Sequence, residues 1–155
     1  MEQMDALYRI LQECIELYEN FLELEYEKYD VVIKNDIEKL DEIVAKEQVF
    51  YMKMRGVEQK REKLIVNMNM KEKTLKEIIL LSEEDKKHIM TSLYDKLTKL
   101  ITDVKKINGL CKTLIEVRLH RIDKVMSEMG ENNNTYTNRE AKNSKYKSRL
   151  ISKKI

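Results

Sequence analysis

The chain has 155 residues, 37% of them charged and 6% aromatic, and its formal net charge is +2. This length predicts one domain, and a net charge so close to zero excludes no class of partner and indicates none. Proline is absent and only 3 glycines are present. Because these two residues interrupt helices, their scarcity predicts an all-α fold made of a few long helices.

The first predicted helix spans residues 5–34. Its apolar residues alternate in steps of three and four, which is the spacing of a coiled-coil seam. A second apolar repeat, with a step of seven residues, runs through Leu17, Leu24 and Val31. The wide apolar face indicates more than one neighbouring helix. The seam residues are Met4, Leu7, Leu11, Cys14, Tyr18 and Phe21.

The second predicted helix spans residues 36–67 and carries a seven-residue repeat at Ile43, Phe50, Val57 and Leu64. Between the two helices, the pair Asn35-Asp36 either caps a new helix or interrupts one continuous rod. We favour a turn and an antiparallel hairpin, because the two seams can then pack against each other instead of both remaining without a partner. Whether the junction is a tight turn or a bend stays open.

A short helix is predicted over residues 74–81, and a long one over residues 82–129 with Ser82 as its N-cap. Arg118 occupies the next seam position of the long helix, and Ile122, Val125 and Met129 then resume out of phase. Such a break alters the local supercoil, so the helix need not face the same neighbour beyond Arg118. The predicted seam consists of Leu93, Leu97, Leu100, Val104, Ile107, Cys111 and Leu114.

Residues 131–155 form a predicted flexible basic C-terminal tail that follows a helical bundle domain of residues 1–130. The tail has a net charge of +5, which leaves −3 on the bundle. It contains too few apolar residues to fold alone, but it keeps five spaced hydrophobes. This pattern is typical of a segment that orders on binding, although a solvated tail without a partner is the alternative. The five are Tyr136, Tyr146, Leu150, Ile151 and Ile155.

Residues suited to catalysis or metal binding are scattered. The two histidines, His88 and His120, lack the paired Glu-x-x-His pattern of a di-iron bundle, so we expect no metal and no cofactor. Cys14 and Cys111 lie in apolar stripes, where cysteine behaves as a small buried hydrophobe and not as a nucleophile. The basic tail with its tyrosines admits single-stranded nucleic acid, but the bundle has no basic face. We expect neither an enzyme nor a nucleic-acid-binding protein.

The N-terminus lacks the apolar core of a signal peptide, and no stretch approaches the roughly 20 apolar residues of a membrane span. We therefore expect a cytoplasmic protein with no stable membrane insertion. A structural coiled-coil or adaptor protein fits these features. It would self-associate through the seam from Leu93 to Leu114, so the chain is expected to be a monomer or a weak dimer through helix seams.

The residues Leu17-Tyr18-Glu19, the helix opening at Asn35-Asp36, the pair Glu47-Gln48 and the segment from Glu58 to Arg61 resemble the flagellar export chaperone family called FlgN. The segment Lys147-Ser148-Arg149-Leu150-Ile151 also looks like the family's C-terminal signature, although the Asp often found after it is missing. The resemblance implies a type III export chaperone. Its clients would be the hook-filament junction proteins FlgK and FlgL, bound through their helical C-terminal segments and brought to the export gate.

In this family the client site lies on the last helix and the segment after it. A tyrosine just past the last helix is implied to dock at the export gate, and this is Tyr136 or Tyr146 here. Which of the two junction proteins is preferred stays open. The implied client contacts are Leu114, Val117, Ile122, Val125, Met129, Leu150 and Ile151.

Overall fold

The computed structural model describes residues 2–130 of the chain. All regular secondary structure in this part is helical, which confirms the all-α prediction. Each predicted helix is present, and its ends differ from the predicted ones by at most three residues. The helices are α1 (Glu2–Ile33), α2 (Ile37–Asn67), α3 (Leu75–Leu80) and α4 (Glu84–Glu128).

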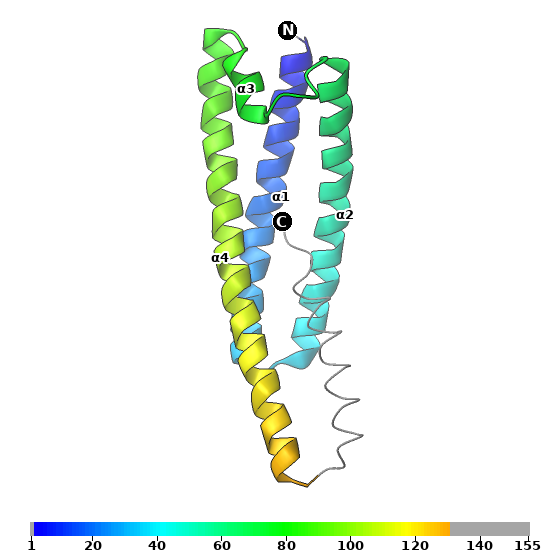
Figure 1. The fold of residues 1–155 in the computed structure, drawn as a ribbon, viewed down its shortest axis with the longest axis vertical. Helices are drawn as coiled ribbons and strands as arrows, with labels where there is room; N and C mark the ends of the chain where they lie inside the picture. The colour runs from blue at the N-terminus through cyan, green and yellow to red at the C-terminus, as the bar shows by residue number, and fades with distance from the viewer. Residues whose placement is uncertain (1, 131–155) are drawn as a thin grey trace.

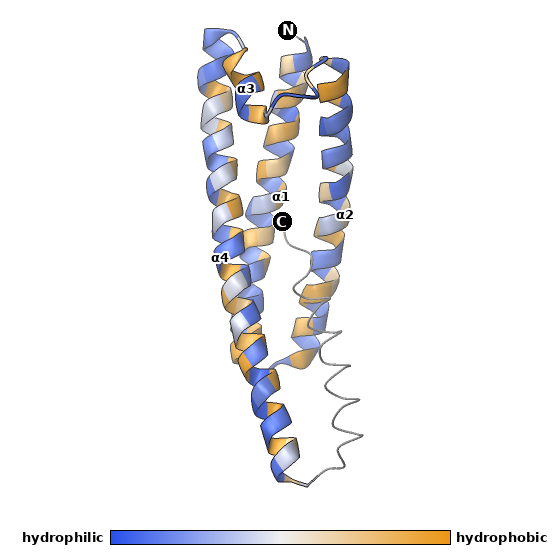
Figure 2. Cartoon of the chain, viewed as in Figure 1, coloured by the Kyte–Doolittle hydropathy of each residue, from blue (hydrophilic) through white to orange (hydrophobic). Residues whose placement is uncertain are grey.

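Helix α1 is central to the bundle, because both α2 and α4 pack along it. Helices α1 and α2 form the predicted antiparallel hairpin, and α4 runs in the same direction as α1 (Figure 1). Hydrophobic and hydrophilic residues alternate along each long helix (Figure 2), as expected for helices that bury one face and expose the other. None of the described helices is long and apolar enough to cross a lipid bilayer.

The junction between α1 and α2 is a tight turn. Asn35 has a φ of 56°, a left-handed conformation that asparagine tolerates better than most residues. The Oδ1 atom of Asp36 then caps α2 by accepting a hydrogen bond from the Lys39 backbone N–H at 3.2 Å. Because only residues 34–36 separate the two helices, the chain reverses direction here, and the alternative of one continuous rod is wrong.

The N-terminus of α4 differs from the prediction. The Ser82 hydroxyl donates a hydrogen bond to the Ile79 carbonyl at 2.6 Å, and the N-cap residue of α4 is Glu83, whose side chain makes no capping bond. The prediction of Ser82 as the N-cap was wrong, because its hydroxyl bonds a carbonyl near the C-terminal end of α3, where helical carbonyls lack intrahelical partners. Glu84 and Asp85 instead stabilise the start of α4 through their charge.

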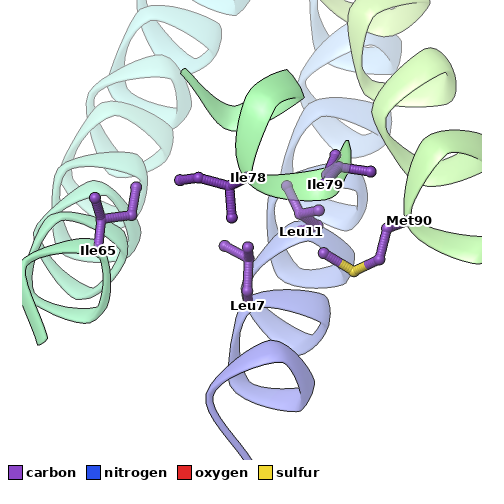
Figure 3. Packing of buried hydrophobic residues seen from close by; sticks show 6 residues of the cluster. All are labelled: Leu7, Leu11, Ile65, Ile78, Ile79 and Met90. Atoms are coloured by element: carbon purple, nitrogen blue, oxygen red, sulfur yellow. The ribbon is translucent and has the colours of Figure 1, made fainter. Parts of the chain in front are cut away.

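Helix α3 closes one end of the bundle. It begins with a complete capping box between Thr74 and Glu77, which satisfies two backbone N–H groups that a helix start leaves open. Its two buried isoleucines pack into a core cluster to which all four of these helices contribute (Figure 3). The buried members of this cluster are Leu7, Leu11, Ile65, Ile78, Ile79 and Met90.

The predicted seams meet in the middle of the bundle. The rings of Phe21 on α1 and Phe50 on α2 stack with their centroids 3.9 Å apart, and Tyr18 meets Phe50 edge-on. Val104 of α4 is fully buried in the same cluster. The seam assignments are confirmed where the residues are buried, at Leu7, Leu11, Cys14, Tyr18, Phe21, Ile43, Phe50, Val57, Val104, Ile107 and Cys111.

A buried charged layer, formed by Glu25, Lys28 and Glu47, crosses the α1–α2 interface. Lys28 Nζ lies 3.1 Å from Glu47 Oε2 and 3.9 Å from Glu25 Oε2, and none of the three side chains is more than 4% exposed. As a carboxylate, Glu25 has no hydrogen-bond partner among the described residues. Burial and the adjacent Glu47 together raise the pKa of Glu25 to about 9, against the opposing effect of Lys28. Once protonated, Glu25 can donate a hydrogen bond to Glu47.

We expect the stability of the native protein to fall as the pH rises from the ordinary glutamate pKa of 4.5 to about 9. In this window the folded protein holds a proton on Glu25 that the unfolded chain has released. The contribution of Glu25 is therefore complete below the lower value and is lost as the pH rises through the upper one, at up to about 1.4 kcal/mol per pH unit. Glu25→Gln mimics the protonated form and should flatten this dependence.

Denaturant unfolding followed by circular dichroism across this pH window measures the effect. Glu27→Gln, an exposed glutamate on the same helix, is the matched control and should keep the wild-type slope. Equal slopes for the wild type and Glu25→Gln would contradict a protonated Glu25.

Both cysteines are buried, as predicted. Cys14 is 5% exposed and Cys111 0%, and the Cys111 thiol donates to the Glu25 carbonyl at 3.8 Å. Burial raises the pKa of Cys14 to about 11 and that of Cys111 to about 12. Both side chains are therefore neutral thiols at neutral pH.

Since the thiolate is the reactive form of cysteine, neither thiol should react with an aromatic disulfide reagent in the native protein at neutral pH. Both should react once the protein is unfolded in urea. A colorimetric thiol titration with and without denaturant gives the answer, and native-state modification as fast as that in urea would contradict the burial of the reacting cysteine.

Candidate functional site

Helix α4 is longer than the hairpin against which it packs. It has 45 residues, compared with 32 in α1 and 31 in α2. Arg118 Nη2 donates a hydrogen bond at 3.0 Å to the carbonyl of Ile33, the last residue of α1, so α1 ends beside this point of α4. The following residues, 119–129, project past the end of α1 for about 15 Å (Figure 1). We call this segment the α4 overhang.

The inward face of α4 shifts by one residue where the overhang begins. Ile115 is buried, whereas the predicted seam residue Leu114 is half-buried beside it. The next inward position is Leu119, so the assignment of Arg118 to the seam was wrong. Two successive steps of four residues, from Cys111 through Ile115 to Leu119, interrupt the heptad and locally unwind the supercoil.

The overhang and the hairpin turn together enclose an apolar groove with a volume of about 670 Å³. We call it the tip groove. One wall is α4, and the other consists of the last turn of α1, the turn at Asn35-Asp36 and the first turn of α2. The apolar lining residues are Val31, Val32, Ile37, Leu40, Ile115, Leu119, Ile122, Val125, Met126 and Met129.

Three of the predicted client-contact residues line this groove. Ile122 and Val125 are about half exposed, at 48% and 49%, and Met129 is 73% exposed. Leu114 lies deeper and packs against the cluster of Val32 and Ile115. Val117 is exposed but does not line the groove. The other predicted site residues, Leu150, Ile151, Tyr136 and Tyr146, lie outside the described residues.

The second wall of the groove was missed in the sequence. Val31 stands in the predicted heptad repeat, and Ile37 is an apolar residue directly after the N-cap Asp36. Ile37 is 71% exposed although it begins a helix that packs on α1.

The 4-3-4-3 spacing of Ile115, Leu119, Ile122, Met126 and Met129 on the other wall was also visible in the sequence. That spacing was the available signal for the groove face of α4.

The charged groups at the groove are mainly basic. Arg118 and Arg121 line it, and Asp36 is the acidic member of the lining. Arg118 is bonded to the Ile33 carbonyl, and the Asp36 carboxylate caps α2. Arg121 is exposed and forms no salt bridge with any residue between 2 and 130. The groove therefore offers an apolar floor beside a guanidinium whose donors are available.

This arrangement suits binding of an apolar surface. His88 and His120 are both exposed on α4, and within residues 2–130 no three or more His, Cys, Asp or Glu side chains group as metal ligands. Concave sites of about 300–1,000 Å³ with apolar walls and few polar groups are typical of binding sites. The volume of the tip groove falls within that range.

Comparison with known proteins gives one match. A family model described as FlgN protein covers residues 1–144, which is most of the 155-residue chain. No curated protein and no solved structure matches it. This match shows that the chain belongs to the FlgN family of flagellar export chaperones.

Proposed function

We propose that this chain is a cytoplasmic chaperone of flagellar type III export that binds the helical C-terminal segments of the hook-filament junction proteins FlgK and FlgL. Binding prevents premature association of these clients, and the complex delivers them to the export gate. The observation that carries the proposal is the tip groove, an apolar surface that no described part of the chain fills. It lies on the last helix, where the family resemblance implies the client site.

The physical basis is the burial of apolar surface. A client helix whose apolar face is exposed in solution is prone to aggregate. A chaperone with a matching apolar groove stabilises the monomeric client by mass action. Methionine side chains adapt their shape to different partners, so Met126 and Met129 in the groove lining suit a chaperone with two related clients.

Each predicted site residue has a role in this proposal. Ile122, Val125 and Met129 contact the apolar face of the client, and Leu114 supports them from beneath, where it packs against Ile115. Val117 touches a client that extends beyond the groove. Leu150 and Ile151 of the tail fold over the bound helix, and Tyr136 or Tyr146 docks at the export gate. The ordering of the tail offsets part of the contact energy, so the affinity stays moderate and the client can be released.

A structural coiled-coil or adaptor protein is the competing function. Such a protein would self-associate through the seam from Leu93 to Leu114. That seam is already used within the chain, because Val104 and Cys111 are 0% exposed and Leu97 and Leu100 pack against the cluster of Phe21 and Phe50. A seam buried in this way disfavours the adaptor.

Calorimetry with the C-terminal segments of FlgK and FlgL tests the proposal directly. We expect full-length protein to bind one segment per chain, and residues 1–130 to bind the same segment at least tenfold more weakly, because a tenfold loss requires only about 1.4 kcal/mol of lost contact. Absence of binding by a well-folded full-length protein would leave the adaptor as the better hypothesis.

A double substitution tests the role of the tail. Leu150→Asp with Ile151→Asp should weaken client binding by roughly tenfold or more, because each apolar side chain contributes about 1.5–3 kcal/mol when fully buried. Helical content measured by circular dichroism should not change. A loss of helicity would place these two residues in the folded core and contradict their role as client contacts.

A further inference from the structure

The tip groove has two walls, one formed by α4 and the other by the tip of the α1–α2 hairpin. The α4 overhang provides Ile122, Met126 and Met129, whose 4-3 spacing places them along about 10 Å of one helix face. The facing wall contains Ile37 and Leu40 of α2. Ile37 is among the most exposed large hydrophobic residues of residues 2–130, at 71%. An apolar side chain so exposed beside an open groove is suited to contact a partner.

We propose that the hairpin tip is the second half of the client site, and that the client is an amphipathic helix with an acidic residue beside its apolar stripe, paired with Arg121. This inference rests on the proposed function and deepens it. A helix laid in a groove contributes apolar anchors at every third or fourth residue. The overhang is long enough to contact about two turns of such a helix.

Charge complementarity selects the acidic residue. Two arginines and one aspartate line the groove. Arg118 is occupied by the Ile33 carbonyl, and Asp36 is occupied by the N-terminus of α2. Arg118 keeps its charge, but its Nη2 is held by a carbonyl, whereas Arg121 forms no salt bridge with any residue between 2 and 130. Arg121 is therefore the guanidinium that can turn fully toward a carboxylate and bind it through two parallel N–H···O bonds.

The same charge argues against two other occupants. The chain's own residues 131–155 carry a net charge of +5, so they are repelled by the basic side of the groove. A second copy docked symmetrically would bring the basic lining of one protomer against the same lining of the other, since a two-fold contact joins identical patches. An acidic amphipathic helix is not repelled by the basic lining in either way.

Two pairs of variants of the full-length protein test the inference, with synthetic C-terminal segments of FlgK and FlgL as probes. Ile37→Asp should weaken binding by about tenfold or more. Met52→Asp is its matched control, because Met52 is 67% exposed on the same helix and does not line the groove. It should bind as the wild type does. Because both side chains are highly exposed, neither substitution should unfold the protein, and circular dichroism checks this.

Arg121→Glu should also weaken binding by about tenfold. Lys124→Glu makes the same charge change at an exposed position of the overhang outside the groove lining, and it should leave the affinity unchanged. Replacing the acidic residues of the probe one at a time by Arg should identify one position that restores binding to Arg121→Glu. That rescue identifies the carboxylate that pairs with Arg121.

The possible outcomes separate the inference from the function on which it rests. If the wild type binds the probes and both Ile37→Asp and Arg121→Glu bind equally well, the chaperone function stands and the second wall is excluded. If residues 1–130 bind more tightly than the full chain, the tail occupies the groove, and the acidic client helix is wrong as its occupant. A wild-type dimer in sedimentation that Ile37→Asp dissociates would identify a second copy instead. If the wild type binds neither probe, the proposed function fails and the inference fails with it.

Discussion

The tip groove depends on the difference in length between α4 and the α1–α2 hairpin. Helices α1 and α2 have nearly equal lengths, 32 and 31 residues, so their seams can satisfy each other from end to end. Helix α4 has 45 residues, and its surplus extends beyond Ile33. A helix within a protein gains most of its stability from packing its apolar face against neighbouring elements. The apolar face of the overhang lacks a described helix to cover it fully, and this produces the tip groove.

The buried charged layer divides the core of the bundle into two unequal parts. On one side lie the clusters around Ile78 and Phe50, and on the other lies the smaller cluster of Val32 and Ile115 beneath the groove. Burying ions is expensive, and their mutual attraction compensates only when the geometry is good. A shift of α1 against α2 by one turn would separate Lys28 from Glu47 and leave the buried Glu47 carboxylate without this partner. The layer thus contributes to the register of the hairpin, and the register sets where the tip lies against α4.

In the proposed function, the groove surface that contacts the client is only partly ordered before binding. The floor of the groove is fixed by buried residues such as Val32 and Ile115, whereas Ile37 and Met129 are more than two thirds exposed. A preformed floor reduces the entropy lost on binding. Exposed rim residues leave area that a client can bury. This division favours reversible binding of a helix, because part of the contact energy is offset by ordering the rim.

The helices follow from the sequence alone, because proline is absent and the heptad repeats are long. The sequence also predicted the seam through Phe21, Phe50 and Val104 and the position of the turn at Asn35. It indicated the groove face of α4, since Ile122 and Met129 leave the seam after Arg118. The position of Ile37 opposite these residues depends on tertiary packing, because the lengths of three helices together set which helix ends meet. Burial of Glu25 was likewise decided by tertiary contacts, since a charged residue in an apolar repeat looks exposed until its partners Lys28 and Glu47 are placed beside it.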